Sequence, residues 1–168
     1  MQVLRTPEDR FADLPGFGYP PRYADVGGLR LAYVEAGPPG GEPVLLLHGE
    51  PSWSFLYRTV MPVLADAGLR VIAADLAGFG RSDKPAEIAD HSYARHVEWI
   101  RALAFDRLDL YRLTLVGQDW GGLIGLGGQS GRLAPADRVG QTVARRERAG
   151  EPSWWSTPVA RPLPDRGE

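Results

Sequence analysis

Three mainly apolar runs, separated by segments with helical periodicity, constrain the fold of this chain most. The runs occupy residues 43–49 (PVLLLHG), 69–76 (LRVIAADL) and 111–117 (YRLTLVG). Such runs are typical of strands buried on both faces, as in parallel sheets covered by helices. The segments between them, residues 54–67 and 92–108, carry apolar residues at helical spacing. This alternation predicts an α/β fold in which the three strands lie parallel and adjacent.

Composition divides the chain into two unequal parts. Its 168 residues are 43% hydrophobic and 24% charged, which is ordinary for a globular domain. Residues 127–168 contain no Ile, Phe, Tyr or Met and are rich in Arg, Gly and Pro, a composition typical of disorder. We therefore expect an organised domain over residues 1–126 and a low-order tail over residues 127–168, in which residues 138–148 could form a short polar helix.

Charge and residue content exclude several function classes. A net charge of −2 gives no basic surface for nucleic acid, and the absence of cysteine excludes disulfides and thiolate metal sites. No apolar run approaches the ~20 residues of a membrane span. The first residues lack the apolar core of a secretory signal. We expect a cytoplasmic protein without a membrane or nucleic-acid partner.

The third apolar run ends at a carboxylate, Asp119, within the stretch LVGQDWGG. One interpretation is that Asp119 caps the following helix, since Asp is among the best N-cap residues. The alternative is the nucleophile elbow of the α/β-hydrolase fold, a strained strand–turn–helix that exposes the nucleophile above the sheet. Serine is the usual nucleophile there. A carboxylate instead displaces a leaving group at an sp3 carbon, forming an ester that water then cleaves. Asp119 therefore points to alkyl halides or epoxides.

The first apolar run leads into a second motif, HGEPSW, which has the position of the HG-type oxyanion loop of this fold. We expect the backbone N–H groups of Glu50 and Trp120 to form the oxyanion hole. His48, Gly49 and Pro51 are expected to shape the loop, and we favour this structural role for His48 over a role as catalytic base.

The other histidines give no convincing base either. His91 and His96 precede Asp119 and have the pattern of helix-surface residues, whereas the base of this fold follows the nucleophile and the acid.

Trp120 follows Asp119 directly and has two interpretations. It could simply pack at the start of a helix. Alternatively, its indole N–H, a donor without acceptor ability, could hold a departing halide ion. Because Asp119 lies beside it, we favour the halide role.

Together these motifs resemble a known family. LLLHGEPSW, GFGRSDKP and LTLVGQDWGGLIGL are similar to the N-terminal part of haloalkane dehalogenases, over residues 1–126 and most strongly over 43–126. The resemblance implies an incomplete α/β-hydrolase fold with Asp119 as nucleophile, Trp120 as halide donor and Glu50 as backbone oxyanion donor. It implies a haloalkane substrate, a released halide ion, and no metal or cofactor.

Other families remain as alternatives. Epoxide hydrolases share the Asp nucleophile, but they usually carry His before it and an apolar residue after HG, where this chain has Gln118 and Glu50. A serine esterase is less favoured, because the GQSGR segment around Ser130 lacks a preceding strand. A non-catalytic remnant or interaction module, acting through the tail, is the third possibility.

The chain also departs from the dehalogenase pattern. The resemblance implies a helical cap with a second tryptophan, further strands, a triad acid and a histidine base, and none of these is recognisable. The helix after the elbow is interrupted by GGQSGRLAPADRVG, where paired glycines weaken a helix. We therefore expect a truncated or frameshifted chain, inactive or nearly so, whose sheet keeps an unpaired hydrophobic edge.

Overall fold

The structure of the protein is a computed structural model that describes residues 1–127 and 141–145. Its strands are β1 (Val3–Leu4), β2 (Arg22–Val26), β3 (Leu29–Ala36), β4 (Pro43–Leu47), β5 (Arg70–Ala74), β6 (Lys84–Pro85), β7 (Thr114–Gln118) and β8 (Gln141–Arg145). Its α-helices are α1 (Val60–Asp66), α2 (Tyr93–Arg101) and α3 (Trp120–Gly125). Short 3-10 helices are η1 (Glu8–Phe11), η2 (Ser54–Tyr57) and η3 (Ile88–Asp90), and the π-helical η4 (Ala102–Arg107) continues α2.

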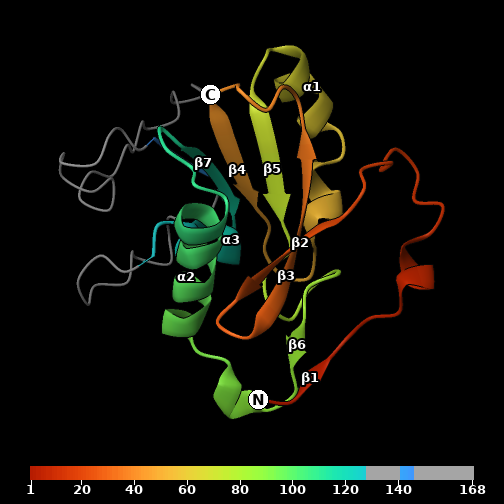
Figure 1. Ribbon diagram of the computed structural model, residues 1–168, viewed down its shortest axis with the longest axis vertical. Helices are drawn as coiled ribbons and strands as arrows, with labels where there is room; N and C mark the ends of the chain where they lie inside the picture. Colours follow the sequence, from red (N-terminus) through yellow and green to blue (C-terminus); the bar gives the residue numbers. More distant parts are fainter. Residues whose placement is uncertain (128–140, 146–168) are drawn as a thin grey trace, which may run out of the picture.

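The central sheet has the order β2-β3-β5-β4-β7-β8 within the described residues. β4 pairs parallel with β5 on one side and with β7 on the other (Figure 1). This confirms the prediction that the three apolar runs form adjacent parallel strands. β2 and β3 extend the sheet as antiparallel strands beyond β5.

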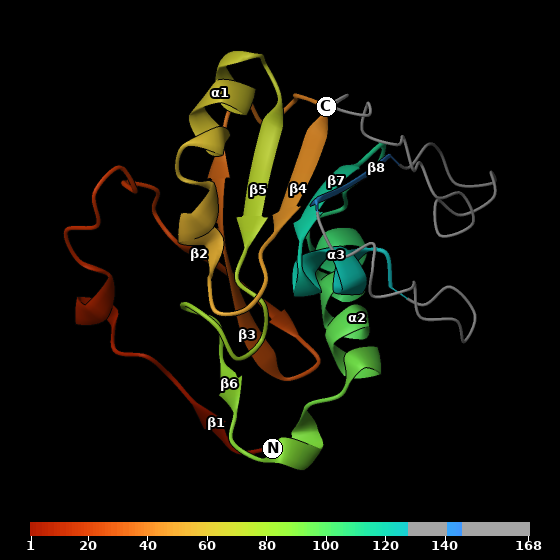
Figure 2. The same cartoon turned by 180° about the vertical axis from the view of Figure 1, so that it is seen from behind.

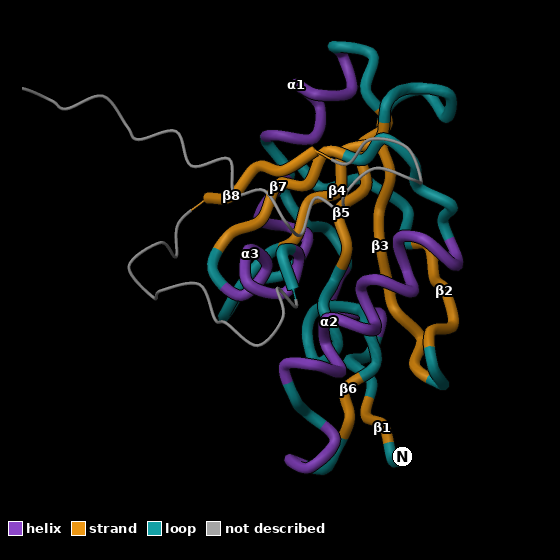
Figure 3. Tube along the Cα trace, turned by 90° about the vertical axis from the view of Figure 1, so that its left-hand side faces the viewer, coloured by secondary structure: helices purple, strands orange, loops and turns teal. Residues whose placement is uncertain are grey.

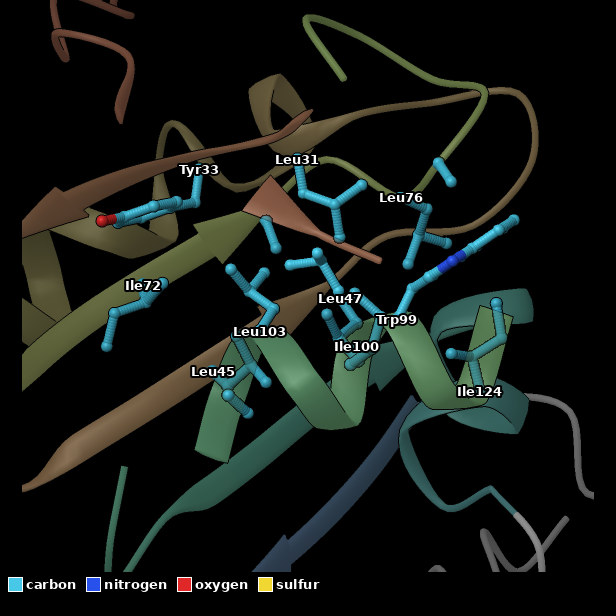
Figure 4. Packing of buried hydrophobic residues seen from close by; sticks show 14 of the residues in the cluster. Leu31, Tyr33, Leu45, Leu47, Ile72, Leu76, Trp99, Ile100, Leu103 and Ile124 are labelled. Carbon is cyan, nitrogen blue, oxygen red and sulfur yellow. The ribbon is translucent and has the colours of Figure 1, made fainter. Parts of the chain in front are cut away.

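Helices cover both faces of the parallel strands, with α1 on one face and α2 and α3 on the other (Figures 1 and 2). Successive residues along each strand therefore enter opposite cores. The core under α2 and α3 includes Leu45, Leu47, Ile72, Ala74, Leu115, Trp99, Ile100 and Ile124 (Figure 4). The core under α1 and η2 includes Val44, Leu46, Val71, Ala73, Tyr57 and Met61. Each large aliphatic side chain that is fully buried contributes about 1.5–3 kcal/mol.

The first predicted helix, over residues 54–67, is divided in the structure into η2 and α1. The cause is Pro62, whose ring would clash with the carbonyl of Arg58 in a continuous α-helix. Proline is tolerated only in the first turn, so α1 begins at Val60. The second predicted helix is present, but its final part is π-helical, with Leu108 N donating to Leu103 O.

One expectation about the tail is wrong. β8 pairs antiparallel with β7 over its full length, so residues 141–145 are a strand instead of part of a polar helix, and β8 is the last strand on this side of the described sheet. The reason is that the open edge of β7 offers backbone N–H and C=O groups that an extended segment satisfies. The rest of the expected low-order tail, Ser130 included, lies outside the described residues.

The N-terminal segment begins in a small two-stranded ribbon and then runs beside the sheet. β1 pairs antiparallel with β6, and both lie beyond the carboxyl ends of the parallel strands (Figures 1 and 3). Within the described part of the chain, no helix is long and apolar enough to cross a membrane.

Candidate active site

The turn between β7 and α3 holds Asp119 in a strained backbone conformation. Its φ of 51° and ψ of −123° are unusual for a residue with a side chain. Two residues later, a Cβ on Gly121 would collide with the carbonyl oxygen of Leu47, so the turn packs directly on the end of β4. The sequence LVGQDWGG thus forms a tight strand–turn–helix with Asp119 at its apex.

The carboxylate of Asp119 is directed towards the loop after β4. Asp119 precedes the first residue of α3, yet its side chain makes no capping hydrogen bond. Instead, Oδ2 accepts a 3.0 Å hydrogen bond from the backbone N–H of Glu50. A Cβ on Gly49 would collide with this carboxylate, so glycine permits the close approach. The interpretation of Asp119 as a simple helix cap is therefore not supported.

His48, which begins this loop, is completely buried and bonded to backbone groups on both sides of its ring. Nε2 accepts a hydrogen bond of 2.9 Å from Leu76 N, and Nδ1 donates one of 3.0 Å to Gly49 O. Burial lowers the pKa of His48 against the opposing effects of the Gly49 carbonyl and of nearby carboxylates. The ring is therefore a neutral structural element of the loop, with neither nitrogen free to act as a base.

The remainder of the loop folds back on itself. Both the backbone N–H and the hydroxyl of Ser52 donate to Gly49 O, at 2.8 and 3.0 Å. The Glu50–Pro51 peptide bond is cis. The side chain of Glu50 is exposed, and its backbone N–H is the group that contacts Asp119.

Trp120 is the first residue of α3, and 46% of its surface is exposed. Among the described residues its indole N–H has no hydrogen-bond acceptor. The indole N–H is therefore a donor without a partner in the described part of the chain, on the residue that follows Asp119.

His91 and His96 form a pair around the start of α2. His91 contacts Pro85 O at 3.0 Å and His96 Nε2 at 3.3 Å. His96 is half-buried, contrary to the surface position expected, because it packs edge-on against Trp99. Burial, followed by the neighbouring His91, lowers the pKa of His96 to about 4. No hydrogen bond within the described residues joins any histidine to Asp119, and in the same part of the chain no cluster of three side chains could hold a metal ion.

Sequence reasoning missed a buried carboxylate, Asp75, at the carboxyl end of another strand of the sheet. Asp75 follows β5 directly, as Asp119 follows β7, and it accepts hydrogen bonds from the backbone N–H groups of Ser54 and Arg81. The available signal was the same one that identified Asp119, namely a charged residue at the carboxyl end of a buried strand.

Comparisons with known proteins agree with this architecture. A family described by its α/β hydrolase fold matches residues 42–126. A haloalkane dehalogenase of Psychrobacter cryohalolentis is 55% identical over 131 residues, which are 75% of this chain and 43% of that protein. The chain spans about half the length of the curated relatives that it matches.

Solved structures give the same result. Haloalkane dehalogenase DpaA from Paraglaciecola agarilytica superposes with a TM-score of 0.71 at 50% identity, covering 75% of this chain and 44% of that one. An epoxide hydrolase from Vigna radiata gives a TM-score of 0.60 at 32% identity, covering 64% of this chain and 34% of that one. The chain is a homologue of the haloalkane dehalogenases and belongs to the α/β hydrolase fold family.

Proposed function

We propose that this chain carries the nucleophilic half of a haloalkane dehalogenase site, built on residues 1–126. In the proposed first step, Asp119 attacks the halogen-bearing carbon of an alkyl halide. A carbon–oxygen bond forms, the carbon–halogen bond breaks, and the halide leaves with the bonding electron pair. The observation that carries this proposal is the 3.0 Å hydrogen bond from Glu50 N to Asp119 Oδ2.

That hydrogen bond distinguishes the two carboxylate oxygens. Oδ2 is held by Glu50, whereas Oδ1 accepts no hydrogen bond within the described residues, so Oδ1 is the proposed attacking atom. Oδ2 then becomes the carbonyl oxygen of the alkyl ester. When water attacks that ester, negative charge develops on Oδ2, and the donor already in place stabilises it. The N–H of Trp120, in the first turn of α3, is the proposed second donor.

The departing halide needs a donor that does not compete as a nucleophile. The indole N–H of Trp120 fits this role because it only donates, and it lies on the residue next to Asp119. Opening an epoxide would in addition require a proton for the alkoxide that forms. The indole is a poor acid, so this donor favours a halide over an epoxide, although epoxide hydrolases remain the alternative supported by the similarity at 32% identity.

Hydrolysis of the ester is the second step, and it requires a base to activate water. Such a base contributes ~100–10,000-fold in rate. None of the three histidines in the described residues is placed for this task. We therefore propose that the chain on its own forms the alkyl ester stoichiometrically and turns over slowly or not at all.

Bromide release from 1-bromobutane tests the proposal. We expect at most about one bromide per chain, and no more than background release with an Asp119→Asn variant, whose amide is a poor nucleophile. Release of many bromide ions per chain would show that a base was missed. A chain that reacts with 1,2-epoxybutane but not with 1-bromobutane would favour the epoxide hydrolase alternative.

A further inference from the structure

We infer that Asp75 is a positioning residue, which fixes residues 48–54 so that the N–H of Glu50 meets the carboxylate of Asp119. The inference rests on the proposed role of Asp119. It concerns a residue that lies outside the two motifs, HGEPSW and QDWGG, from which that role was argued.

The Asp75 carboxylate joins two loops that are separate in sequence. Its side chain is almost completely buried, with 1% of the residue exposed. Oδ1 accepts a 2.8 Å hydrogen bond from Ser54 N, and Oδ2 accepts one of 2.8 Å from Arg81 N. A buried carboxylate requires such donors, and hydrogen bonds to an ionised acceptor are stronger than neutral ones. Ser54 N is therefore held in place by a charge.

The neighbouring residue holds the other end of the same loop. Leu76 N donates to His48 Nε2 at 2.9 Å. Two consecutive residues at the carboxyl end of β5 thus hold the first and last residues of the segment 48–54. Glu50 lies between these two points, and its N–H is the group that contacts Asp119.

Arg81 supports the loop from outside without neutralising Asp75. Its guanidinium lies 4.4 Å from the ring centre of Phe11 and 5.2 Å from that of Trp53. Trp53 belongs to the same loop, and stacking of a cation on an indole ring is attractive. Within the described residues the only ion pair of Arg81 is with Glu8, at 3.7 Å. In the described part of the chain the hydrogen bonds to the Asp75 carboxylate thus include the backbone N–H groups of Ser54 and Arg81, and the cation that interacts with it from further away is Lys84.

The structure also supplies a matched control. Asp83 lies at the end of the same loop and is equally buried, with 1% exposed. It bonds to Arg5 and to Arg30 N, and it has no hydrogen bond with residues 48–54. Asp83→Asn therefore removes a carboxylate that is equally buried, that is ion-paired with Arg5 and Arg30, and that makes no hydrogen bond to residues 48–54.

The test follows the Glu50 amide resonance of the isotope-labelled full chain by NMR. Asp119→Ala defines its position when the hydrogen bond is lost. With Asp75→Asn we expect the Glu50 resonance to move upfield towards that position. The exchange of the Glu50 amide hydrogen with solvent should accelerate about tenfold, because the displaced amide loses its hydrogen bond to the charged Asp119. With Asp83→Asn we expect neither change. Equal effects of both Asn variants, or no effect of either, would overturn the inference.

A second variant covers the case in which Asp75→Asn does not fold. Ser54→Pro removes the N–H that Asp75 accepts and places the ring Cδ against the Asp75 carboxylate, so it breaks the same contact from the side of the loop. The extended conformation of Trp53 suits a following proline, and Ser54 begins η2, where proline is tolerated. The same upfield shift of Glu50 is expected, and an unshifted Glu50 in this variant would contradict the inference. If the wild-type chain is not alkylated by 1-bromobutane, the proposed function fails, whereas the Glu50 resonance still decides the role of Asp75.

Discussion

The backbone N–H of Glu50 and Oδ2 of Asp119 lie 3.0 Å apart, although 69 positions separate the two residues in sequence. Glu50 follows β4 and Asp119 follows β7, and these strands are adjacent and parallel. Their carboxyl ends therefore meet at the same edge of the sheet. The pairing of two apolar strands is what creates the candidate site.

Replacing Gly49 tests how closely the loop approaches the Asp119 carboxylate. The backbone of Gly49 does not require glycine, but a methyl group there would collide with the Asp119 carboxylate. We expect Gly49→Ala to displace that carboxylate and to slow alkylation by 1-bromobutane about 100-fold. The free energy of unfolding should fall by about 1–3 kcal/mol. Gly40→Ala, where a Cβ meets no atom within 4 Å, is the control and should change neither value. Equal alkylation of the two variants would disprove the close approach.

Trp120→Phe separates the indole donor from the packing of the ring. Removal of one donor to developing charge slows a reaction by about 100–1,000-fold, and we expect alkylation of Asp119 to slow by up to about 100-fold. Because 46% of Trp120 is exposed, the free energy of unfolding should change by less than about 1 kcal/mol. Time courses measured by mass spectrometry check the first value and urea unfolding the second. An unchanged alkylation rate would show that the indole N–H of Trp120 plays no part in the reaction.

Two buried serines should respond oppositely to replacement by alanine. Ser54 Oγ has no hydrogen-bond partner among the residues that the structure describes, whereas Ser82 Oγ donates to Asp75 O at 2.7 Å and accepts from Ala32 N at 2.8 Å. Ser54→Ala should leave the free energy of unfolding unchanged or raise it by up to about 1 kcal/mol. Ser82→Ala leaves a buried N–H unsatisfied and should lower it by about 1–3 kcal/mol. Thermal unfolding of both variants gives the comparison, and a larger loss for Ser54→Ala would contradict it.

Stability should also depend on pH through His96. Its pKa is about 4 in the folded chain, against the ordinary 6.5, because burial and then His91 disfavour the charged ring. The unfolded chain therefore binds a proton more readily, so the stabilisation is complete above pH 6.5 and is lost as the pH falls towards 4. The buried ring of His48 acts in the same direction. Urea unfolding between pH 7 and pH 4.5 measures the decline in the free energy of unfolding. This decline should be shallower in the His96→Phe variant. Identical slopes in both proteins would refute this origin.

The sequence predicted the parts of the fold in which local pattern and burial agree. Apolar runs buried on both faces identified β4, β5 and β7. A charge followed by glycines at a strand end identified the turn at Asp119. The break at Arg58–Val60 was less evident, because helical periodicity continues across Pro62 even though the backbone cannot.

Other features depend on which groups meet in space. Nothing in the periodicity of residues 141–145 indicates pairing with β7, since the open edge of that strand selects its partner by backbone hydrogen bonds. Asp75 is visible in the sequence as a charge after a buried strand. The sequence does not show that the two oxygens of Asp75 accept hydrogen bonds from Ser54 N and Arg81 N, because these groups meet only when the two loops have folded.

The most direct test of the central claim is to locate the alkyl group after incubation with 1-bromobutane. Trypsin cleavage after Arg112 and Arg132 releases residues 113–132, a peptide whose single side-chain carboxylate is Asp119. We predict a butyl adduct on this peptide from the wild-type chain and none from the Asp119→Asn variant. An adduct on other peptides only, or one that is equally abundant in the Asp119→Asn variant, would show that Asp119 is not the nucleophile.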